Sequence, residues 1–317
     1  MPDPSDRQSK GSILLTGATG FIGRRIQDRL ISQGWRLRVL ARSSSLRAGN
    51  LNPVAEHVDG SLADEHALAR GVAGSSAVIN CAGTVRGLKL EDFLPANVDG
   101  VLALCTAVSR LSAPPAVLHL SSLAAELPDL SNYARSKRDG EKTLERFPDL
   151  NWTIIRPPAV YGPGDREMRA ALGWARRGIV PVPGGDRKQR LSMLHVDDLV
   201  EAVLAWLKMP AAHRHRTYSI HDGKADGYDW DEFADAVMKN PNGKRVFIAL
   251  PTGLLDGVAW VNEQAARVSG RAIMLSRGKV RELTHPAWVA DNAAFSQASG
   301  WQPQIPLAQG VSGLFES

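Results

Sequence analysis

The sequence predicts a doubly wound α/β fold, with helices on both faces of a parallel sheet and a smaller α+β lobe in the C-terminal half. Two observations predict it. Short apolar segments alternate with amphipathic helical patterns along the first half of the chain. These segments are apolar along their whole length, as parallel strands buried on both faces are. In such folds, ligands bind at the carboxyl ends of the strands.

The first half of the chain supplies the predicted sheet. Residues 12–16 form a short apolar run, and the amphipathic pattern of residues 21–33 ends at Gly34, a residue that favours helix termination. A second strand is expected at residues 37–41. The alternation continues with strands at 57–59, 77–80, 117–121 and 152–155 and with helices at 64–70, 98–111 and 133–147.

The pattern changes beyond residue 160. Helical stretches are expected at 167–177, 197–208 and 228–239, but isolated strands and long loops containing Gly and Pro separate them. Such a segment cannot continue the sheet simply, so we expect residues 161–317 to form a smaller lobe that packs discontinuously over the strand ends. Residues 1–10 lack the apolar stretch of a secretory signal and are expected to be a disordered lead.

A glycine-rich turn follows the first predicted strand. In Thr16-Gly17-Ala18-Thr19-Gly20-Phe21-Ile22-Gly23 the glycines allow a tight turn, close backbone approach to a pyrophosphate and tight helix packing, and the helix N-terminus faces the anion. The spacing differs by one residue from the commoner G-x-G-x-x-G. Its position between an apolar strand and an amphipathic helix favours a dinucleotide-binding domain at residues 11–160.

The end of the second predicted strand indicates which dinucleotide binds. An acidic residue there would bind the ribose 2′-hydroxyl of NAD, whereas an arginine would pair with the 2′-phosphate of NADP. The sequence reads Arg42-Ser43-Ser44-Ser45, without an acid, which favours NADP(H) over NAD(H). The alternative is that Arg42 is a solvated loop cation.

Two other strand ends carry residues suited to the cofactor. Asp59 ends the third predicted strand and could accept from the adenine amino group, or it could cap the helix that begins near Ala63. Cys81-Ala82-Gly83 ends the fourth with small residues, as close passage of a cofactor requires.

Tyr133 and Lys137 lie four residues apart in a predicted helix and project from one face. The ammonium group can then lie near the phenol and lower its pKa, so that the tyrosine exchanges a proton near neutral pH. Ser121 and Ser122 end the fifth strand, where a hydroxyl faces the ligand crevice. Capping is the alternative for this pair, but the nearby tyrosine and lysine favour a contact with substrate oxygen. Lys137 would also hold the nicotinamide ribose.

These motifs resemble the extended short-chain dehydrogenase/reductase family, in its epimerase/dehydratase-like branch. The resemblance covers nearly the whole chain, and its most specific part is the run from Arg156 to Asp165, R-P-P-A-V-Y-G-P-G-D. It implies a Rossmann domain followed by a substrate-binding lobe. It also implies that Ser122 rather than Ser121 is the catalytic serine, that Asn97 steadies the active-site helices, and that His195 anchors the lobe.

The expected site residues fall into three groups. The expected catalytic residues are Asn97, Ser122, Tyr133 and Lys137. The expected cofactor contacts are Gly17, Thr19, Gly20, Phe21, Ile22, Arg42, Asp59, Gly60, Cys81, Ala82, Gly83, Ser121, Tyr133, Lys137, Pro157 and Val160. The candidates for substrate binding are Thr84, Arg86 and Arg190.

Two departures from the family pattern narrow the reaction. The interval from Ser122 to Tyr133 is shorter than in sugar-nucleotide members, which indicates a reduced substrate loop there. Leu123-Ala124 stands where dehydratase members carry an acidic pair, which disfavours dehydration. We expect an NADP(H)-dependent oxidoreductase that moves hydride between nicotinamide and a ketone or secondary alcohol. The alternatives are a nucleotide-sugar epimerase with retained NAD and a non-catalytic cofactor-binding accessory or sensor protein.

The substrate is expected to be a bulky or lipid-like ketone, of the 3-oxo lipid, sphingolipid or steroid type. The apolar stretch from Ile248 to Val261 could line a hydrophobic entrance, touch a membrane surface or form an ordinary buried helix, and we favour the buried helix. A group of basic residues could instead bind the diphosphate of a nucleotide-sugar, or be solvated on helix surfaces: Arg166, Arg169, Arg176, Arg177, Arg187, Lys188 and Arg190. A homodimer formed through the helices that start near Asn97 and Tyr133 is also expected from the resemblance.

Composition excludes several other classes of protein. The net charge is +5, but basic residues are interspersed with acids and form no run, so no nucleic-acid partner is expected. Cys81 and Cys105 both lie in apolar segments, which favours buried thiols over a disulfide. No metal-ligand spacing appears. The most apolar segment, residues 246–261, is shorter than the ~20 residues of a membrane span, and we expect a cytoplasmic protein.

Overall fold

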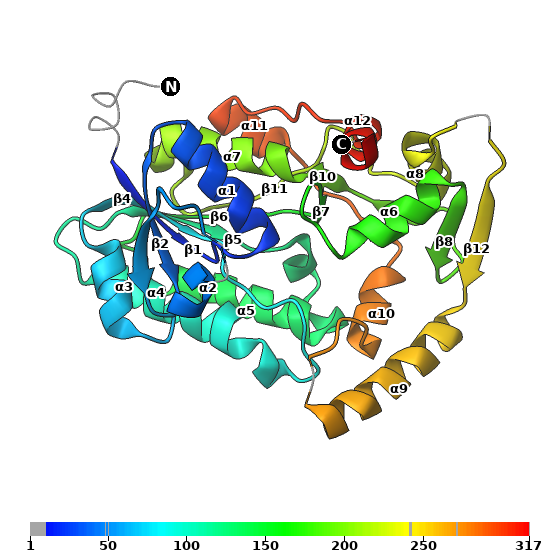
Figure 1. The fold of residues 1–317 in the computed structure, drawn as a ribbon, viewed down its shortest axis with the longest axis horizontal. Coiled ribbons are helices and arrows are strands. Elements are labelled where there is room, and N and C mark those ends of the chain that lie inside the picture. The colour runs from blue at the N-terminus through cyan, green and yellow to red at the C-terminus, as the bar shows by residue number, and fades with distance from the viewer. Residues whose placement is uncertain (1–10, 48, 50, 241–242, 271, 317) are drawn as a thin grey trace.

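The computed structural model describes residues 11–47, 49, 51–240, 243–270 and 272–316, so the lead expected at residues 1–10 lies outside the described part. Seven parallel strands form the central sheet, in the order β11-β6-β5-β4-β1-β2-β3 (Figure 1). These strands are β1 (Ser12–Thr16), β2 (Arg36–Ala41), β3 (Glu56–Asp59), β4 (Ser75–Asn80), β5 (Ala116–Leu120), β6 (Trp152–Arg156) and β11 (Arg216–Ser219). The strand order reverses between β1 and β4, which is where such folds bind their ligands.

Helices cover both faces of this sheet, which confirms the doubly wound α/β fold. One layer contains α1 (Phe21–Ser32), α7 (Val196–Lys208) and α11 (Ala293–Ser299). The other contains α3 (Glu65–Val72), α4 (Gly100–Ser109) and α5 (Asn132–Glu145). Within β1, Ile13 and Leu15 pack in the first core cluster and Leu14 packs in the second. Because β1 is buried on both faces, its sequence is apolar along nearly its whole length, whereas the edge strands β3 and β11 are partly exposed and polar.

Several short helices connect these layers. The helix expected at residues 98–111 begins as a π-helical turn, after which α4 continues from Gly100 to Ser109. The short elements are α2 (Ser43–Arg47), η2 (Leu90–Asp92), η3 (Pro95–Asp99), η4 (Leu123–Glu126), η5 (Pro128–Leu130) and η6 (Pro210–His213).

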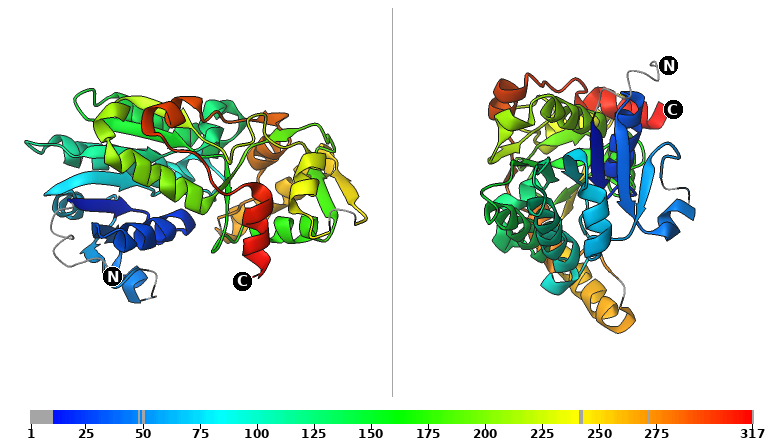
Figure 2. Two further views of the ribbon diagram at one scale, coloured as in Figure 1. Left: turned by 90° about the horizontal axis from the view of Figure 1, so that it is seen from above. Right: turned by 90° about the vertical axis from the view of Figure 1, so that its left-hand side faces the viewer.

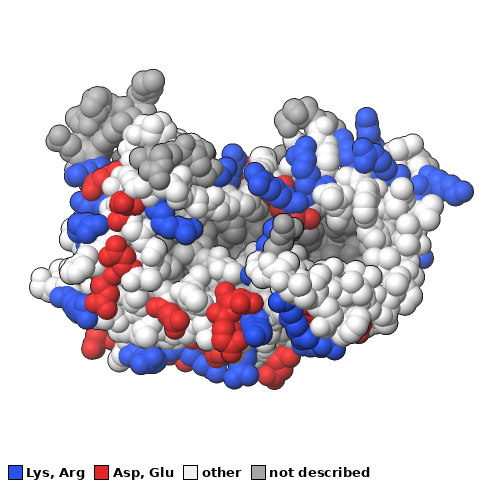
Figure 3. Space-filling view, turned by 60° about the horizontal axis from the view of Figure 1, so that its bottom comes forward, with Lys and Arg blue, Asp and Glu red and all other residues white. Residues whose placement is uncertain are grey.

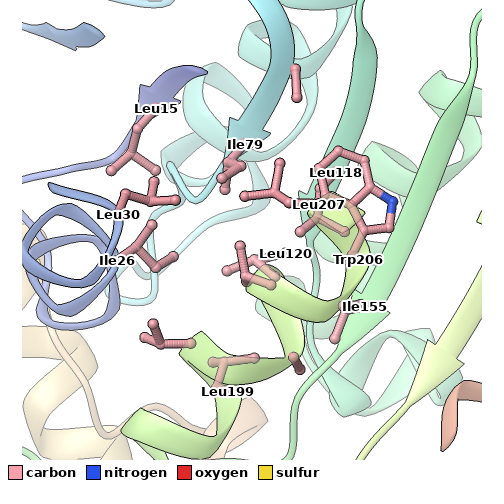
Figure 4. Packing of buried hydrophobic residues seen from close by; sticks show 14 of the residues in the cluster. Leu15, Ile26, Leu30, Ile79, Leu118, Leu120, Ile155, Leu199, Trp206 and Leu207 are labelled. Carbon is pink, nitrogen blue, oxygen red and sulfur yellow. The ribbon is translucent and has the colours of Figure 1, made fainter. Parts of the chain in front are cut away.

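The first core cluster joins the two halves of the chain. Figure 4 shows side chains of the sheet together with those of α1 and of α7, which comes from the second half. Trp206 of α7 is fully buried, and its indole nitrogen donates to Thr153 Oγ1 at 2.9 Å. Arg25 of α1 donates to both carboxylate oxygens of Asp197 at the start of α7. These contacts hold α7 against the sheet and against α1.

The seventh strand lies beyond residue 160. β11 pairs in parallel with β6, so the later part of the chain does extend the sheet, which corrects our expectation that it cannot do so simply. The reason lies in α7, whose apolar side packs on the sheet and lets this helix serve as the crossover between parallel strands. The chain therefore enters the lobe, returns to the sheet and leaves it again.

The remaining elements form a lobe at one end of the molecule (Figure 2). Three two-stranded ladders tie it together, and all three are parallel. Their strands are β7 (Ala159–Tyr161) with β10 (Met193–His195), β8 (Ile179–Pro183) with β12 (Val246–Leu250), and β9 (Arg190–Leu191) with β13 (Ala287–Trp288). The helices are α6 (Met168–Arg176), α8 (Trp230–Val237), α9 (Thr252–Ser269), α10 (Arg277–Leu283) and α12 (Leu307–Glu316).

Helix α9 differs from the buried helix that the sequence favours at residues 248–261. It lies at the edge of the molecule in Figure 1 and projects from it in the right-hand view of Figure 2. Leu254 and Val261 are each 58% exposed, and Trp260 is 52% exposed. The expectation is wrong because only one narrow side of α9, centred on Glu263, is covered by the protein. No helix in the described part of the chain is both long and apolar enough to cross a membrane.

Candidate active site

The glycine-rich turn between β1 and α1 has the shape of a cradle. Gly17 has a φ of +70°, and a Cβ atom there would lie 2.5 Å from the Ala82 backbone nitrogen. A Cβ atom at Gly23 would lie 2.2 Å from the Gly17 carbonyl oxygen. Any larger residue at either position would clash with backbone atoms, so glycine is required at both. The turn therefore fits the pyrophosphate of a dinucleotide.

The first turn of α1 is open to an anion. Its N-cap residue, Gly20, makes no side-chain cap, and the turn contains no acidic residue. Phe21 and Ile22 begin the helix and are half-buried, while Thr19 precedes the cap and accepts from Arg24 Nε through its carbonyl at 3.1 Å. Uncapped backbone N–H groups and the helix dipole both favour negative charge at this end.

The carboxyl ends of β2 and β3 lie side by side. Arg42 directly follows β2 and is exposed. The Asp59 carboxylate accepts from the backbone N–H of Ser43 at 2.7 Å, so it holds the turn that carries Arg42. The helix-capping alternative for Asp59 is wrong, because Asp64 caps α3 by accepting from Ala67 N.

Small residues line the ends of the neighbouring strands. Gly60 extends the β2–β3 ladder by donating to the Ala41 carbonyl at 3.2 Å, and a Cβ atom there would lie 2.3 Å from the Ala67 methyl. Cys81, Ala82 and Gly83 follow β4 beside the glycine turn. Burial raises the pKa of the Cys81 thiol to about 12, so this thiol is uncharged at neutral pH.

Ser122 and Tyr133 lie in contact at the carboxyl edge of β5. Ser122 precedes η4, and its hydroxyl accepts from Ala124 N at 3.2 Å. Tyr133 stands in the first turn of α5, which Ser131 caps, and the Ser122 hydroxyl lies close enough to its phenol to lower the pKa of that phenol. The structure thus brings together two residues that the sequence places on different elements.

The pKa of Tyr133 differs from the expectation. The sequence predicts that Lys137 lowers it, but the pKa is raised to about 12, mainly by burial of the phenolic oxygen, with the Ser122 hydrogen bond opposing and Glu282 adding to the rise. The expected lowering is wrong because loss of hydration outweighs the stabilising contacts. A phenol with this pKa is protonated at neutral pH.

Lys137 lies one turn further along α5 and is only 4% exposed. Its ammonium group donates to the Leu120 carbonyl at the end of β5, at 2.9 Å. Burial lowers its pKa from 10.5 to about 8, while the nearby Glu141 carboxylate acts in the opposite direction. Lys137 therefore keeps most of its positive charge at neutral pH and points at the strand end that precedes Ser121.

Asn97 ties three segments of the site together. Its Oδ1 accepts from Thr84 N at 2.8 Å, and its Nδ2 donates to the Thr84 carbonyl at 3.0 Å and to Ser136 Oγ at 2.8 Å. A Cβ atom at Gly140 would lie 2.1 Å from the Asn97 carbonyl oxygen, so the π-helical turn sits directly on α5. Asn97 thus joins the loop after β4 to the helix that carries Tyr133.

Residues between β5 and β7 complete this edge. Ser121 Oγ is buried and has no hydrogen-bond partner among the described residues. A buried hydroxyl without a partner fits a position that binds a cofactor. Pro157 is buried, and its carbonyl accepts from Leu123 N at 2.9 Å. Val160 is half-buried in β7, which pairs with β10. An orphaned hydroxyl and a glycine cradle at one strand edge both fit a dinucleotide.

The three candidates for substrate binding are not equally placed. Thr84 lies at the site, next to Asn97, but both its backbone N–H and its carbonyl are hydrogen-bonded to the Asn97 side chain. Arg86 pairs with Glu167 and so links the loop after β4 to the lobe. Arg190 pairs with Glu232 of α8 at 2.6 Å, which places its charge inside the lobe. The structure therefore does not gather the two arginines around Tyr133.

His195 lies where β10 meets α7, a position that suits the anchoring role implied by the resemblance. It ends β10, caps α7 by accepting from Asp197 N, and packs edge-on against the Tyr161 ring at 5.3 Å. Burial lowers its pKa, so it is uncharged at neutral pH.

Two features were not singled out by the sequence. Arg156 of β6 makes a two-point ion pair with the buried Glu141 of α5, at 2.9 and 2.6 Å. Glu141 lies four residues after Lys137, and this helical spacing could have indicated it. Glu282 of α10 accepts a hydrogen bond from Ser131, the N-cap of α5. No local sequence pattern predicts a contact between residues so far apart in the chain.

Comparisons with known proteins agree with this geometry. The model of the NAD dependent epimerase/dehydratase family matches residues 13–220. Ceramide reductase from Caulobacter vibrioides is 34% identical over 308 residues, covering 97% of this chain and 91% of the relative. The 2-alkyl-3-oxoalkanoate reductase from Stenotrophomonas maltophilia is 26% identical over 331 residues, covering 95% and 98%.

Solved structures share the fold. UDP-glucuronic acid 4-epimerase from Bacillus cereus, in complex with UDP-glucuronic acid and NAD, matches with a TM-score of 0.72 at 16% sequence identity, covering 96% of this chain and 98% of the other.

Proposed function

Because the chain belongs to the NAD dependent epimerase/dehydratase family and is an NAD(P)-dependent enzyme of the extended short-chain dehydrogenase/reductase type, we propose that it reduces a bulky, lipid-like ketone with NADPH. The site residues named above would serve this reaction. Gly17 and Gly20 would lie against the pyrophosphate, and Ser121 and Pro157 would lie near the nicotinamide. When bound, the nicotinamide supplies the hydride.

The observation that carries the proposal is the contact of Tyr133 with Ser122 at the sheet edge. A carbonyl oxygen placed between the two hydroxyls would accept a hydrogen bond from Ser122 and a proton from Tyr133. A phenol with a pKa of about 12 is protonated at neutral pH, which suits a proton donor. The Lys137 ammonium group would then stabilise the tyrosinate that remains.

The preference for NADPH rests on the end of β2. Arg42 is exposed beside the turn that Asp59 holds, and no acid follows the strand. A guanidinium group there would pair with a 2′-phosphate in a two-point contact, whereas the 2′-hydroxyl of NAD would gain no carboxylate partner.

The lipid-like ketone is supported by the relatives and by the shape of the chain. Two relatives that align over nearly their whole length are named as reductases, one of ceramide and one of 2-alkyl-3-oxoalkanoates. The loop between Ser122 and Tyr133 contains only two short 3-10 helices, with Leu123 and Ala124 buried at its start. A ketone between long apolar groups fits such a site better than a sugar does.

The nucleotide-sugar alternative is less well supported. Arg187 pairs with Asp231 and Arg190 pairs with Glu232, so two arginines that could hold a diphosphate are engaged by α8. The likeness to UDP-sugar epimerases, at 16% identity, concerns the fold alone. A non-catalytic role is disfavoured because Tyr133 and Lys137 are both present.

A panel of substrates and cofactors tests the proposal. The purified protein would be assayed for oxidation of NADPH and of NADH with 3-oxo sphingolipids, 2-alkyl-3-oxoacids, 3-oxo steroids and UDP-sugars. We expect turnover with a 3-oxo lipid and with NADPH in preference to NADH. Tightly retained NAD with activity on UDP-sugars alone would contradict the proposal.

A further inference from the structure

The exposed side of α9 carries an uninterrupted apolar stripe. Its members are Leu254, Val258, Val261, Ala265 and Val268, all exposed, with Val268 exposed by 92%. They follow one another at intervals of four, three, four and three residues, so they lie on one face of the helix. The stripe runs along most of an 18-residue helix, about 27 Å long.

No part of the described protein covers this stripe. The residues of α9 that are buried are Ala259, Glu263 and Ala266, which lie on the opposite side of the helix. Figure 3 shows a broad area without charged side chains over α9. Trp260 is also half exposed, but it lies about 100° around the helix from Val261, toward the covered side.

A basic pocket flanks the C-terminal half of α9. It has a volume of about 380 Å³ and lies between α9, α10 and the loop before η2. Its charged residues are Lys89, Glu91, Glu263, Arg267, Arg277 and Arg281. Glu263 is paired with Arg277, and Arg281 donates to the Leu130 carbonyl. Cations outnumber acids in the pocket by four to two.

The residues beside the stripe argue against a second copy of the chain. A helix that pairs with another helix through such a seam carries charged residues at the flanking positions, which select the partner. Here those positions are Leu255, Gly257, Asn262, Gln264 and Ser269, and none is charged. An apolar stripe with uncharged flanks, on a helix that also borders a basic pocket, suits the surface of an anionic bilayer instead.

We propose that α9 docks this protein on an anionic membrane surface. The apolar stripe enters the boundary between headgroups and acyl chains, while Lys89 and Arg267, in the pocket on the side of α9 away from the stripe, extend toward the lipid phosphates above it. The proposal does not depend on the substrate proposed above, because docking is measured without turnover. If the substrate is a membrane lipid, docking also brings it to the lobe.

Vesicle flotation tests this proposal. The full chain would be mixed with vesicles of phosphatidylcholine alone, or of phosphatidylcholine with phosphatidylglycerol, and the bound fraction measured. We expect binding to the anionic vesicles, which weakens in high salt. The double variant Val258→Asp/Val261→Asp should lose at least about tenfold in affinity. Lys89→Gln and Arg267→Gln should each lose about fivefold on anionic vesicles.

The control is Val54→Asp, which changes an exposed valine in the loop between β2 and β3. Val54 is 62% exposed, which is close to the 58% of Val261. The Val54→Asp variant should bind vesicles as the wild type does. Thermal unfolding of each variant would verify its fold. Equal binding by the stripe variant and the wild type would overturn the proposal. So would absence of vesicle binding together with a dimer that the stripe variant converts to a monomer, which would assign the stripe to a second copy.

Discussion

Arg156 and Glu141 form a two-point ion pair in which the guanidinium donates to both carboxylate oxygens. Glu141 is fully buried and lies one turn beyond Lys137 on α5, whereas Arg156 ends β6. The pair therefore fixes the rotation of α5 against the sheet. The directions of Tyr133 and Lys137 follow from that rotation.

Removing the guanidinium should destabilise the protein. Arg156→Gln leaves the buried Glu141 carboxylate with Arg138 as its remaining ionic partner, and we expect the free energy of unfolding to fall by about 1.5–3 kcal/mol in urea titrations. The matched control is Arg110→Gln, because Arg110 pairs with Glu65 and both side chains are mostly exposed. That variant should lose at most about 1 kcal/mol. Equal losses of unfolding free energy in the two variants would show that the buried pair stabilises the protein no more than an exposed pair does.

Adding a methyl group to the glycine cradle should weaken cofactor binding strongly. In Gly23→Ala the new Cβ meets the Gly17 carbonyl oxygen at 2.2 Å, so the turn must shift, at a cost of about 1–3 kcal/mol. Gly253→Ala is the control, because no atom lies within 4 Å of its added Cβ, and this exposed helical position should become more stable by about 0.5–1 kcal/mol. NADPH titrations would compare the two. Unimpaired binding by Gly23→Ala would mean that the cofactor lies elsewhere.

Reversing the charge at Arg42 should change the choice of cofactor. Arg42→Asp loses a charge-assisted contact to the 2′-phosphate, so we expect the dissociation constant for NADPH to rise at least about tenfold while that for NADH changes little. Arg36→Asp, at the opposite end of β2, is the control and should leave both constants unchanged. A similar loss for both cofactors in Arg42→Asp would refute the phosphate contact.

The pH profile of the reduction should report Lys137. Burial lowers its pKa to about 8, whereas that of Tyr133 is about 12. We therefore expect kcat/KM for the ketone to be level below about pH 8 and to fall as the pH rises through it, because neutral Lys137 cannot stabilise a tyrosinate. Lys137→Arg, which stays charged, should abolish this fall. A decline only near the ordinary lysine pKa of about 10.4 would contradict the assignment.

Much of this fold could be predicted because the first half of the chain carries its own local signals. Most of the strands from β1 to β6 contain apolar runs, although β3 is largely polar, and the glycine turn and the Tyr133–Lys137 spacing each depend on neighbouring residues. β11 could not be placed from the sequence, because its position depends on how α7 packs across the sheet. The same holds for the exposed side of α9, since a sequence pattern does not reveal which face lacks a neighbour.

Within the site, the residues that come together were easier to predict than the direction of their pKa shifts. Ser122, Tyr133, Lys137 and Asn97 meet around the ends of β4 and β5, but the pKa of Tyr133 moves upward rather than downward. Helical spacing indicates that Lys137 is near Tyr133. It does not indicate how far the half-buried phenol is removed from water, which decides the direction of the pKa shift.

The most direct test of the account is the rate of NADPH-dependent reduction of a 3-oxo lipid by Tyr133→Phe, measured beside its NADPH affinity. Loss of the proton donor should lower kcat by at least about 100-fold while the dissociation constant for NADPH stays close to that of the wild type. A kcat near the wild-type value with unchanged cofactor binding would show that Tyr133 does not supply the proton.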